Sequence, residues 1–237
     1  STGVHTVAFV MSDGDNLQIL QNDFMSSRHW SHPQRGSYPT SWSYSPAMAQ
    51  LMPSMLAYVA RTATANDSLT TGPSGVGYAY PQLYTPTSRE IFAQATNQLM
   101  AEARMSVVNV IGVTPSEQSV AVIAAQPEVD GIIYFTFGVA DQGYAGLHGN
   151  VAYTNGKPVV GLRSCLWGDG KSGDKVGVEG LIRDLHALPK DPSNPQSYSI
   201  IVNEMGNGWD SIRNASQILM EDGGFVRCER VVVLRLL

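Results

Sequence analysis

The stretch VHTVAFVMSDGDN, Val4–Asn16, sets the expected fold of this 237-residue chain. Its first part is mostly apolar, which predicts a buried strand over Val4–Met11. Two carboxylates, Asp13 and Asp15, follow this strand at once, and Gly14 between them allows a tight turn. The stretch therefore predicts a strand whose carboxyl end carries polar chemistry.

Further along the chain, short apolar runs alternate with longer segments of helical period, as expected of βα units around a parallel sheet. The clearest helix is Pro46–Ala63, whose apolar residues recur at three- and four-residue spacings. We therefore predict one TIM-like (β/α) barrel over residues 1–237, with seven or eight mostly parallel strands, rather than an open doubly wound sheet. Further strands are expected at Ser106–Ile111, Gly131–Phe137, Pro158–Leu162, Ser199–Val202 and Val226–Leu236, and further helices at Ser88–Arg104, Pro115–Ala125, Val178–Ala187 and Trp209–Glu221.

Composition restricts the partners of the chain. Lys and Arg number 15 against 20 Asp and Glu, the formal net charge is -5 and no basic run occurs, so nucleic-acid binding is not expected. No apolar stretch approaches the ~18 residues of a membrane span. Charged residues make up 15% of the chain, against roughly 25% in an average soluble protein, which suits neutral polar and aromatic loops that bind sugars. Cys165 and Cys228 are expected to be two buried residues rather than part of a zinc site, and one disulfide between them stays open.

We expect the active site in the loops that follow the carboxyl ends of the strands, as in (β/α) barrels generally. Asp13 and Asp15 are the first candidate catalytic acids, with Asn16 beside them as a substrate-binding residue. A divalent cation is an alternative ligand, but an oxygen site needs about six ligands and this loop supplies only part of them. An Asx turn or a helix cap would explain one of the two aspartates, not both.

The long segment Asn22–Tyr44 is rich in aromatic residues. A loop beyond ~12–15 residues in a compact domain is usually functional or disordered, and the aromatic residues argue against disorder. We predict that Trp42 and Tyr44 form stacking platforms for sugar rings, with packing in the core as the alternative. His29 and His32 have no matching third ligand, which favours a structural role over a metal site.

The segment GVGYAYP, Gly75–Pro81, lies where a second strand should end. Gly75 and Gly77 would let the backbone approach a ligand closely. Tyr78 and Tyr80 would offer it an apolar face and a hydroxyl group. A glycine-rich corner with packed tyrosines is the structural alternative, and these residues alone leave both interpretations open.

GVGYAYP matches the signature of the GxGYxYP family of glycoside hydrolase-like proteins, and the chain resembles the C-terminal domain of that family nearly end to end. The resemblance implies a barrel of the glycoside hydrolase type that an N-terminal domain normally precedes. It is also carried by Ser12–Asn16, Pro39–Pro46, Asn66–Asp67, Gly72–Ser74 and Lys157–Pro158, followed by Arg163 and Leu166–Trp167.

The chain begins at Ser1, with neither a Met nor a signal peptide. Together with the resemblance, this start predicts that an N-terminal domain of the same polypeptide is a partner. A glycan substrate favours a secreted, periplasmic or cell-surface location.

Glycosidases generally use a pair of carboxyl groups, about 5–5.5 Å apart in retaining enzymes and about 6.5–9.5 Å apart in inverting enzymes. Glu204 is the best partner for either aspartate of the first loop, because it follows the apolar run Ile200–Val202. Asn203 beside it is expected to bind substrate. Capping of the following helix is an equally weighted alternative for Glu204.

Three more candidates follow the apolar run Val159–Leu162. Arg163 is expected to orient a catalytic carboxylate or bind an acidic sugar, and a salt bridge to a nearby aspartate is the alternative. Trp167 is expected on the aromatic rim of the site. Asp169 is expected to contact substrate and, with Asp141, is a reserve acid.

We therefore predict a glycoside hydrolase that acts on an oligo- or polysaccharide through a carboxylate pair. No phosphate loop, dinucleotide fingerprint or GxSxG elbow occurs, so neither a cofactor nor serine hydrolysis is expected. One alternative is a carbohydrate-binding barrel without catalysis. Another is a metal-dependent hydrolase such as a deacetylase, in which Asp13 and Asp15 bind the metal and His5 or His29 assists.

Overall fold

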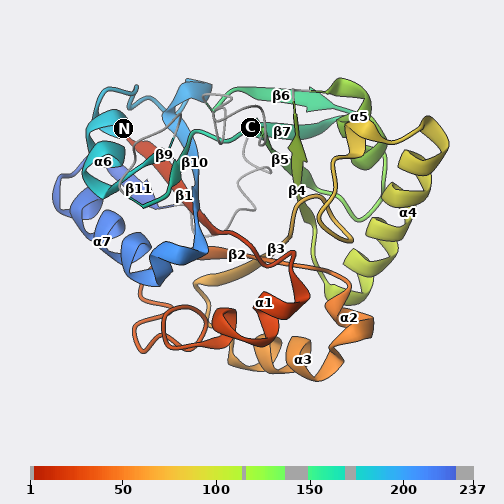
Figure 1. Ribbon diagram of the computed structural model, residues 1–237. Coiled ribbons are helices and arrows are strands. Elements are labelled where there is room, and N and C mark those ends of the chain that lie inside the picture. The colour runs from red at the N-terminus through yellow and green to blue at the C-terminus, as the bar shows by residue number, and fades with distance from the viewer. Residues whose placement is uncertain (1–2, 114–115, 137–148, 169–174, 228–237) are drawn as a thin grey trace.

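Strand β1 (His5–Met11) lies inside the larger of two sheets in the computed structural model, which describes residues 3–113, 116–136, 149–168 and 175–227 (Figure 1). β10 (Tyr198–Asn203) pairs with β1 in parallel on one side. On the other side, β2 (Thr40–Tyr44) pairs with the carboxyl-terminal end of β1 and β11 (Phe225–Arg227) with its amino-terminal end. The sheet also contains β3 (Asp67–Thr71), β8 (Ser164–Leu166) and β9 (Lys175–Val176), in the order β3-β2-β1-β10-β8-β9.

A second sheet consists of β4 (Val107–Gly112), β5 (Gly131–Thr136), β7 (Lys157–Gly161) and β6 (Val151–Thr154), in that order. β4, β5 and β7 are parallel, and β6 runs antiparallel to β7. The expected α/β class with mostly parallel strands is therefore confirmed. Within the described residues no ladder pairing joins β3 to β4 or β7 to β8, so closure of the two sheets into a barrel is not shown.

The inward faces of the two sheets share one apolar cluster. Side chains alternate between the two faces of a strand, so Ala8 and Val10 of β1 point inward while Phe9 points outward. Because residues of both sheets meet in this cluster, the carboxyl ends of their strands surround a common opening. The cluster comprises Ala8, Val10, Val107, Ile111, Ile133, Phe135, Val160, Leu162, Cys165, Ile200 and Val202.

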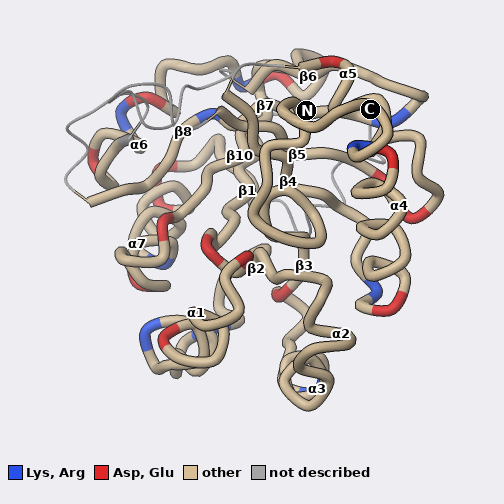
Figure 2. Tube along the Cα trace, turned by 45° about the vertical axis from the view of Figure 1, so that its right-hand side comes forward, with Lys and Arg blue, Asp and Glu red and all other residues tan. Residues whose placement is uncertain are grey.

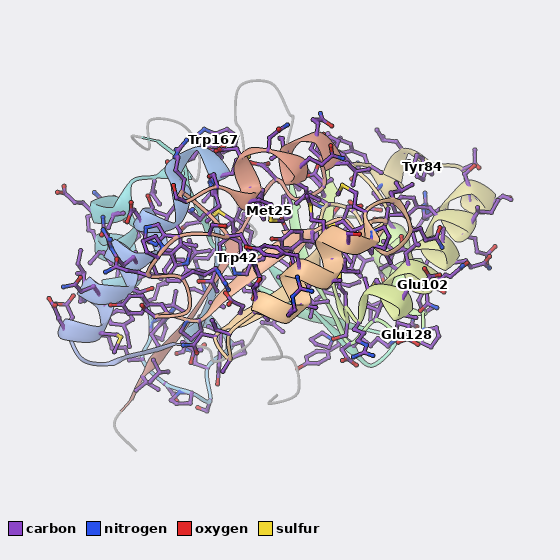
Figure 3. The ribbon with its side chains drawn as sticks, turned by 90° about the horizontal axis from the view of Figure 1, so that it is seen from below. Met25, Trp42, Tyr84, Glu102, Glu128 and Trp167 are labelled. Atoms are coloured by element: carbon purple, nitrogen blue, oxygen red, sulfur yellow. The ribbon has the colours of Figure 1, made fainter. Side chains whose placement is uncertain are left out.

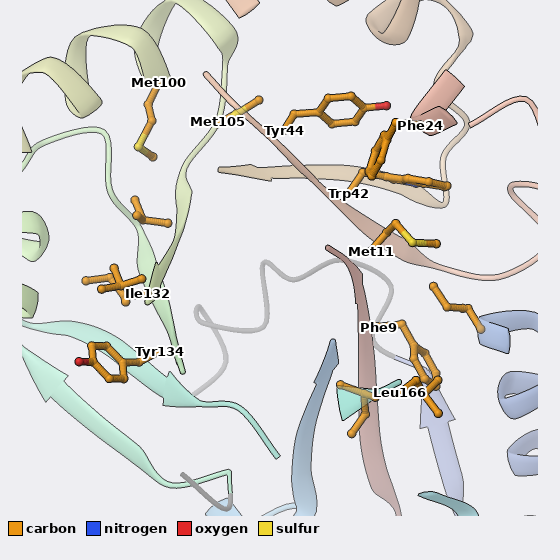
Figure 4. Close-up of a cluster of buried hydrophobic side chains, with 14 of the residues drawn as sticks. Phe9, Met11, Phe24, Trp42, Tyr44, Met100, Met105, Ile132, Tyr134 and Leu166 are labelled. Carbon is orange, nitrogen blue, oxygen red and sulfur yellow. The ribbon is translucent and has the colours of Figure 1, made fainter. Parts of the chain in front are cut away.

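Helices lie outside the strands (Figure 1), and outward-facing strand residues pack beneath them in a larger apolar cluster. Figure 4 shows the part of this cluster around Phe24, Trp42 and Tyr44, whose rings meet edge to face at centroid distances of 5.8 Å for Phe24–Trp42 and 5.1 Å for Phe24–Tyr44. None of the described helices is both long and apolar enough to cross a membrane. The helices are α1 (Leu17–Gln21), α2 (Met48–Leu51), α3 (Pro53–Thr62), α4 (Pro86–Ala103), α5 (Glu117–Ala124), α6 (Val178–His186) and α7 (Gly208–Glu221).

Two expected elements differ from the structure. The helix expected over Pro46–Ala63 is divided into α2 and α3, because Pro53 has no N–H group and begins a new helix. The segment Asn22–Tyr44 is not all loop, since its end forms β2. This strand was missed because its inward side chains are hydroxyl groups. Most of the last expected strand, Val226–Leu236, lies outside the described residues, and β11 contains its first two residues.

Candidate active site

A partly open pocket lies at the carboxyl ends of strands from both sheets, next to the inward apolar cluster. Its cavity volume is about 80 Å³, which accommodates a few water molecules or one polar substituent of a sugar ring. Val10, Ile111, Phe135 and Val202 are shared between the pocket and the cluster. The polar lining consists of Ser12, Asp13, Asp15, Ser43, Tyr78 and Asn109.

The loops after β1, β2 and β3 pack backbone against backbone beside this pocket. A Cβ atom on Gly14 would overlap the Ser43 carbonyl oxygen, and a Cβ atom on Gly72 would lie 2.7 Å from the Cα of Asp15. Asp13 has a left-handed backbone with φ of 68°, which is uncommon for a residue with a side chain. The glycines of SDGDN and GPS are therefore required for the close approach that fixes both aspartates in place.

Asp15 is the most buried acid of the pocket. Only 9% of its surface is exposed, and its Oδ2 atom has no hydrogen-bond partner among the described residues. Burial, with a smaller contribution from the charge of Asp13, raises the pKa of Asp15 to about 6. A carboxyl group of this kind holds its proton close to neutral pH, as a general acid must.

Asp13 differs from Asp15 in its neighbours. Burial raises the pKa of Asp13 as well. The neighbouring Ser12 hydroxyl, the Met205 backbone N–H and His29 oppose this rise. These groups offset part of the rise at Asp13, and Asp15 has no comparable side-chain neighbours, so the two carboxyl groups of one loop have raised pKa values in different environments.

Glu204 follows β10 and adds a third carboxyl group to this region. Burial raises its pKa, the Gly206 N–H opposes the rise, and the charge of Asp13 adds to it. Glu204 precedes a 3-10 turn rather than α7, whose N-cap is Asn207, so the alternative role as the cap of that helix is not observed. In Figure 2, Lys and Arg residues lie mainly toward the periphery of the trace, and some of the Asp and Glu residues lie near its centre, beside β2 and β3.

Two histidines near these acids have structural contacts. His29 is buried, and its ring nitrogens lie 3.0 Å from the Asp23 carbonyl oxygen and 2.6 Å from that of Met205. His32 packs instead on Trp209, with ring centroids 4.9 Å apart. In the part of the chain that the structure describes, no group of three or more His, Cys, Asp and Glu residues could hold a metal ion.

The GVGYAYP segment contributes one side chain to the pocket. Tyr78 lines it with 51% of its surface exposed, and its hydroxyl group lies 3.0 Å from that of Tyr80. Gly75 has φ of 100° and faces Thr96 of α4 closely, so the close approach that the structure shows is to a helix, and contact with a ligand there stays a prediction. Gly77 is half-buried and accepts a backbone hydrogen bond from Ser74, 3.0 Å away.

Trp42 and Tyr44 do not face the pocket, and the expectation that they bind sugar is wrong. Both are fully buried on the outward face of β2, because residues that alternate with the inward Ser43 point into the helix layer. The indole Nε1 of Trp42 donates to Asp67 at 2.9 Å. Figure 3 shows Trp42 in the interior beneath the helices and Trp167 toward the edge of the molecule.

Arg163 and Asn203 also lie away from the pocket. The Arg163 guanidinium donates to Gln196 at 2.9 Å and to Ser199 at 3.1 Å, near the amino end of β10, which is the opposite end of the strands from the acids. Asn203 points outward and donates to the Gly208 carbonyl oxygen at 2.9 Å. Both expectations of substrate contact are therefore wrong, since residues just past an apolar run were assumed to point into the site.

Of the remaining candidate residues, one lines the pocket. This residue is Trp167, and its contact with substrate stays a prediction. Asn16 is half-buried at the start of α1 and is not among the lining residues. Asp141 and Asp169 lie outside the described residues, as does Cys228, while Cys165 is buried in the inward cluster.

Sequence reasoning missed Asn109, Ser43 and Phe135, which line the pocket from β4, β2 and the end of β5. Asn109 had a signal, because it is the single polar residue of the apolar run VVNVIG, Val107–Gly112. A polar side chain in the middle of a buried strand needs hydrogen-bond partners, which marks it as a candidate for a site. Ser43 and Phe135 had no comparable signal.

Comparison with known proteins gives one family and several similar solved structures. The model of the GxGYxYP putative glycoside hydrolase C-terminal domain matches residues 3–230. A putative hydrolase from Bacteroides thetaiotaomicron has the same fold, with a TM-score of 0.87 at 22% identity over 100% of this chain and 46% of that one. The chain thus spans less than half the length of that protein. No curated protein matches the sequence significantly.

Two solved deacetylases are more distant. The putative polysaccharide deacetylase from Mycobacterium smegmatis has a TM-score of 0.49 at 11% identity, over 94% of this chain and 84% of that one. The peptidoglycan deacetylase PdaC from Bacillus subtilis has a TM-score of 0.48 at 10% identity, over 99% and 92%. At these scores neither similarity carries an argument about function.

Proposed function

The chain belongs to the GxGYxYP family, and on this premise we propose that it hydrolyses a glycosidic bond in an oligo- or polysaccharide. The observation that carries the proposal is the set of interacting carboxyl groups at the carboxyl ends of the strands. Asp13 and Asp15 line one pocket, and Glu204 interacts electrostatically with Asp13. Acids in unlike environments are what general acid and base catalysis of glycoside hydrolysis requires.

We assign the acid role to Asp15 and the ionised role to Asp13. Asp15 retains its proton to about pH 6 and donates it to the leaving glycosidic oxygen. Asp13, whose raised pKa is partly offset by Ser12, the Met205 N–H and His29, acts as the base that activates water or as the nucleophile that attacks the anomeric carbon. Glu204 does not line the pocket, so we place it as a neighbour whose pKa the charge of Asp13 helps to raise rather than as the reacting carboxylate.

The test is release of reducing ends from a mixed oligosaccharide pool. Asp13→Asn and Asp15→Asn should each lower kcat by at least ~100-fold, since acid–base residues typically contribute 10²–10⁴-fold. Asp184→Asn, at an exposed position on α6, is the matched control and should retain full activity. Full activity of both pocket variants would refute the assignment.

The two rival functions give different results in the same experiment. A binding barrel without catalysis would retain sugar affinity and release no reducing ends. A metal-dependent hydrolase would lose its activity on treatment with a chelator, whereas the proposed acid pair would not.

We further propose that the two sheets form an irregular TIM-like barrel, that an N-terminal domain of the same polypeptide adjoins it, and that the protein acts outside the cytoplasm. The shared inward cluster supports the first point. The second and third rest on the family and on the expected glycan substrate. Fractionation of cells that express the full-length protein tests its location directly.

A further inference from the structure

The pocket contains an amide oxygen whose direction is fixed. Asn109 of β4 is only 3% exposed, and its Nδ2 donates to the Thr71 carbonyl oxygen at 2.7 Å and to the Thr70 hydroxyl at 3.1 Å. A carbonyl oxygen only accepts hydrogen bonds, so the atom that faces Thr71 must be the nitrogen. The Oδ1 atom of Asn109 therefore points away from β3.

This oxygen has no hydrogen-bond partner among the described residues. Leaving a buried acceptor unsatisfied costs about 1–3 kcal/mol, and such atoms in a native protein call for an explanation. The Oδ2 atom of Asp15 is also buried without a partner, and both residues line the same pocket. Together with the Oγ atom of Ser12, which is likewise buried without a partner among the described residues, three unsatisfied oxygens thus adjoin one cavity of about 80 Å³, one from β4 and two from the loop after β1.

We propose that Asn109 and Asp15 form a subsite for one hydroxyl group of a neutral sugar, in which that hydroxyl donates its hydrogen bond to Asn109 Oδ1. The amide oxygen can only accept, so it requires a donor on the ligand. A protonated Asp15 can in turn donate to the oxygen of the same hydroxyl. This inference rests on the proposed sugar specificity of the pocket, but not on bond cleavage.

A cation fits these atoms poorly. Oxygen sites for Ca²⁺ use six to eight ligands, commonly several carboxylates, and the three unsatisfied atoms are an amide oxygen, a serine hydroxyl and a carboxyl group that retains its proton to about pH 6. A hydroxyl group of a ligand instead satisfies Asn109 and Asp15 at once, because it donates one hydrogen bond and accepts another.

The subsite is tested by ligand-observed NMR titration with methyl hexopyranosides of the gluco, galacto and manno series, together with their monodeoxy and deoxyfluoro analogues. Fluorine does not donate a hydrogen bond. At one ring position, therefore, the deoxy and the deoxyfluoro analogues should both bind at least ~10-fold more weakly than the parent glycoside, as expected when a built hydrogen-bond acceptor is left unpaired.

Two variants separate this role from a structural one. Asn109→Leu removes the acceptor and should reduce the preference for the hydroxyl over the fluorine to less than ~3-fold, whatever happens to overall affinity. Thr70→Val removes a neighbouring hydrogen bond to the same side chain but leaves Oδ1 in place, so it should retain the full preference. Because the preference is a ratio, general destabilisation of the site cancels.

Three results would overturn the subsite: no binding of any parent glycoside, no position at which both analogues lose affinity, or a full preference retained in Asn109→Leu. If Asn109→Leu does not fold, the affinities of the wild-type protein for the deoxy and deoxyfluoro analogues still test the subsite. Glycosides that bind with the expected preference but are never cleaved would count against hydrolysis alone.

Discussion

Replacing Asp15 by Asn should stabilise the fold at neutral pH while it lowers kcat by at least ~100-fold. The carboxyl group is nine-tenths buried, and its pKa is raised from the ordinary value of 3.8 to about 6. Each pKa unit corresponds to about 1.4 kcal/mol, so keeping Asp15 ionised in the folded state costs about 3 kcal/mol. Asn has the same shape and no charge, and it removes this cost.

The pH dependence has a definite sign. Between about pH 4 and pH 6 the folded protein binds a proton at Asp15 that the unfolded chain does not, so the wild-type free energy of unfolding falls as pH rises through this window. The stabilities of the two proteins should therefore converge near pH 4 and differ by about 3 kcal/mol near pH 8. For a chain of this size, that difference corresponds to a melting temperature about 6–12 °C higher in the variant.

Thermal or urea unfolding of both proteins across this pH range is the assay. His5 also titrates abnormally, because its burial lowers its pKa, but it does so in both proteins and drops out of the difference. Asp184→Asn, at the surface of α6, should leave the pH profile unchanged. A variant that is no more stable than wild type near pH 8, or a gap independent of pH, would refute the reasoning.

Four more outcomes are expected. Asp67→Asn should lower the free energy of unfolding by about 3–5 kcal/mol in urea, since it breaks the buried ion pair with Arg35; unchanged stability would contradict this. Trp42→Ala should lower the free energy of unfolding by about 3–5 kcal/mol and leave KM unchanged in the folded protein, because the indole lies in the core. A raised KM at unchanged stability would instead show that Trp42 contacts the substrate. Tyr78→Ala should raise KM about 10-fold at constant melting temperature, because its ring is half-exposed in the pocket. Wild-type kcat should fall as pH rises through about 6, where Asp15 loses its proton. A kcat that does not change between about pH 5 and pH 8 would exclude Asp15 as the acid.

The position of the pocket could be predicted from the sequence because β1 is long, apolar and directly followed by SDGDN. The carboxyl ends of parallel strands gather polar loops, so Asp13 and Asp15 were expected where the pocket lies. The strands β4, β5, β7 and β10 were found for the same reason, since each is an apolar run.

The direction of individual side chains could not be predicted. A one-residue difference in register moves a side chain to the other face of a strand, and no feature of TSWSY shows that Ser43 faces inward and Trp42 outward. Arg163 illustrates the same difficulty, since its guanidinium group donates to Gln196, in the turn before β10, and does not reach the acids of the pocket. The pairing of Asn109 with β3 depends on contacts between residues almost forty positions apart, which a single sequence does not reveal.

The most direct test of the account is the mass of the products that the wild-type protein forms from a pool of partly acetylated oligosaccharides. Hydrolysis at Asp13 and Asp15 predicts shorter fragments whose combined mass exceeds that of the parent by one water, and no such fragments with Asp15→Asn. Loss of acetyl groups from chains of unchanged length, or no product from any oligosaccharide that binds, would contradict it.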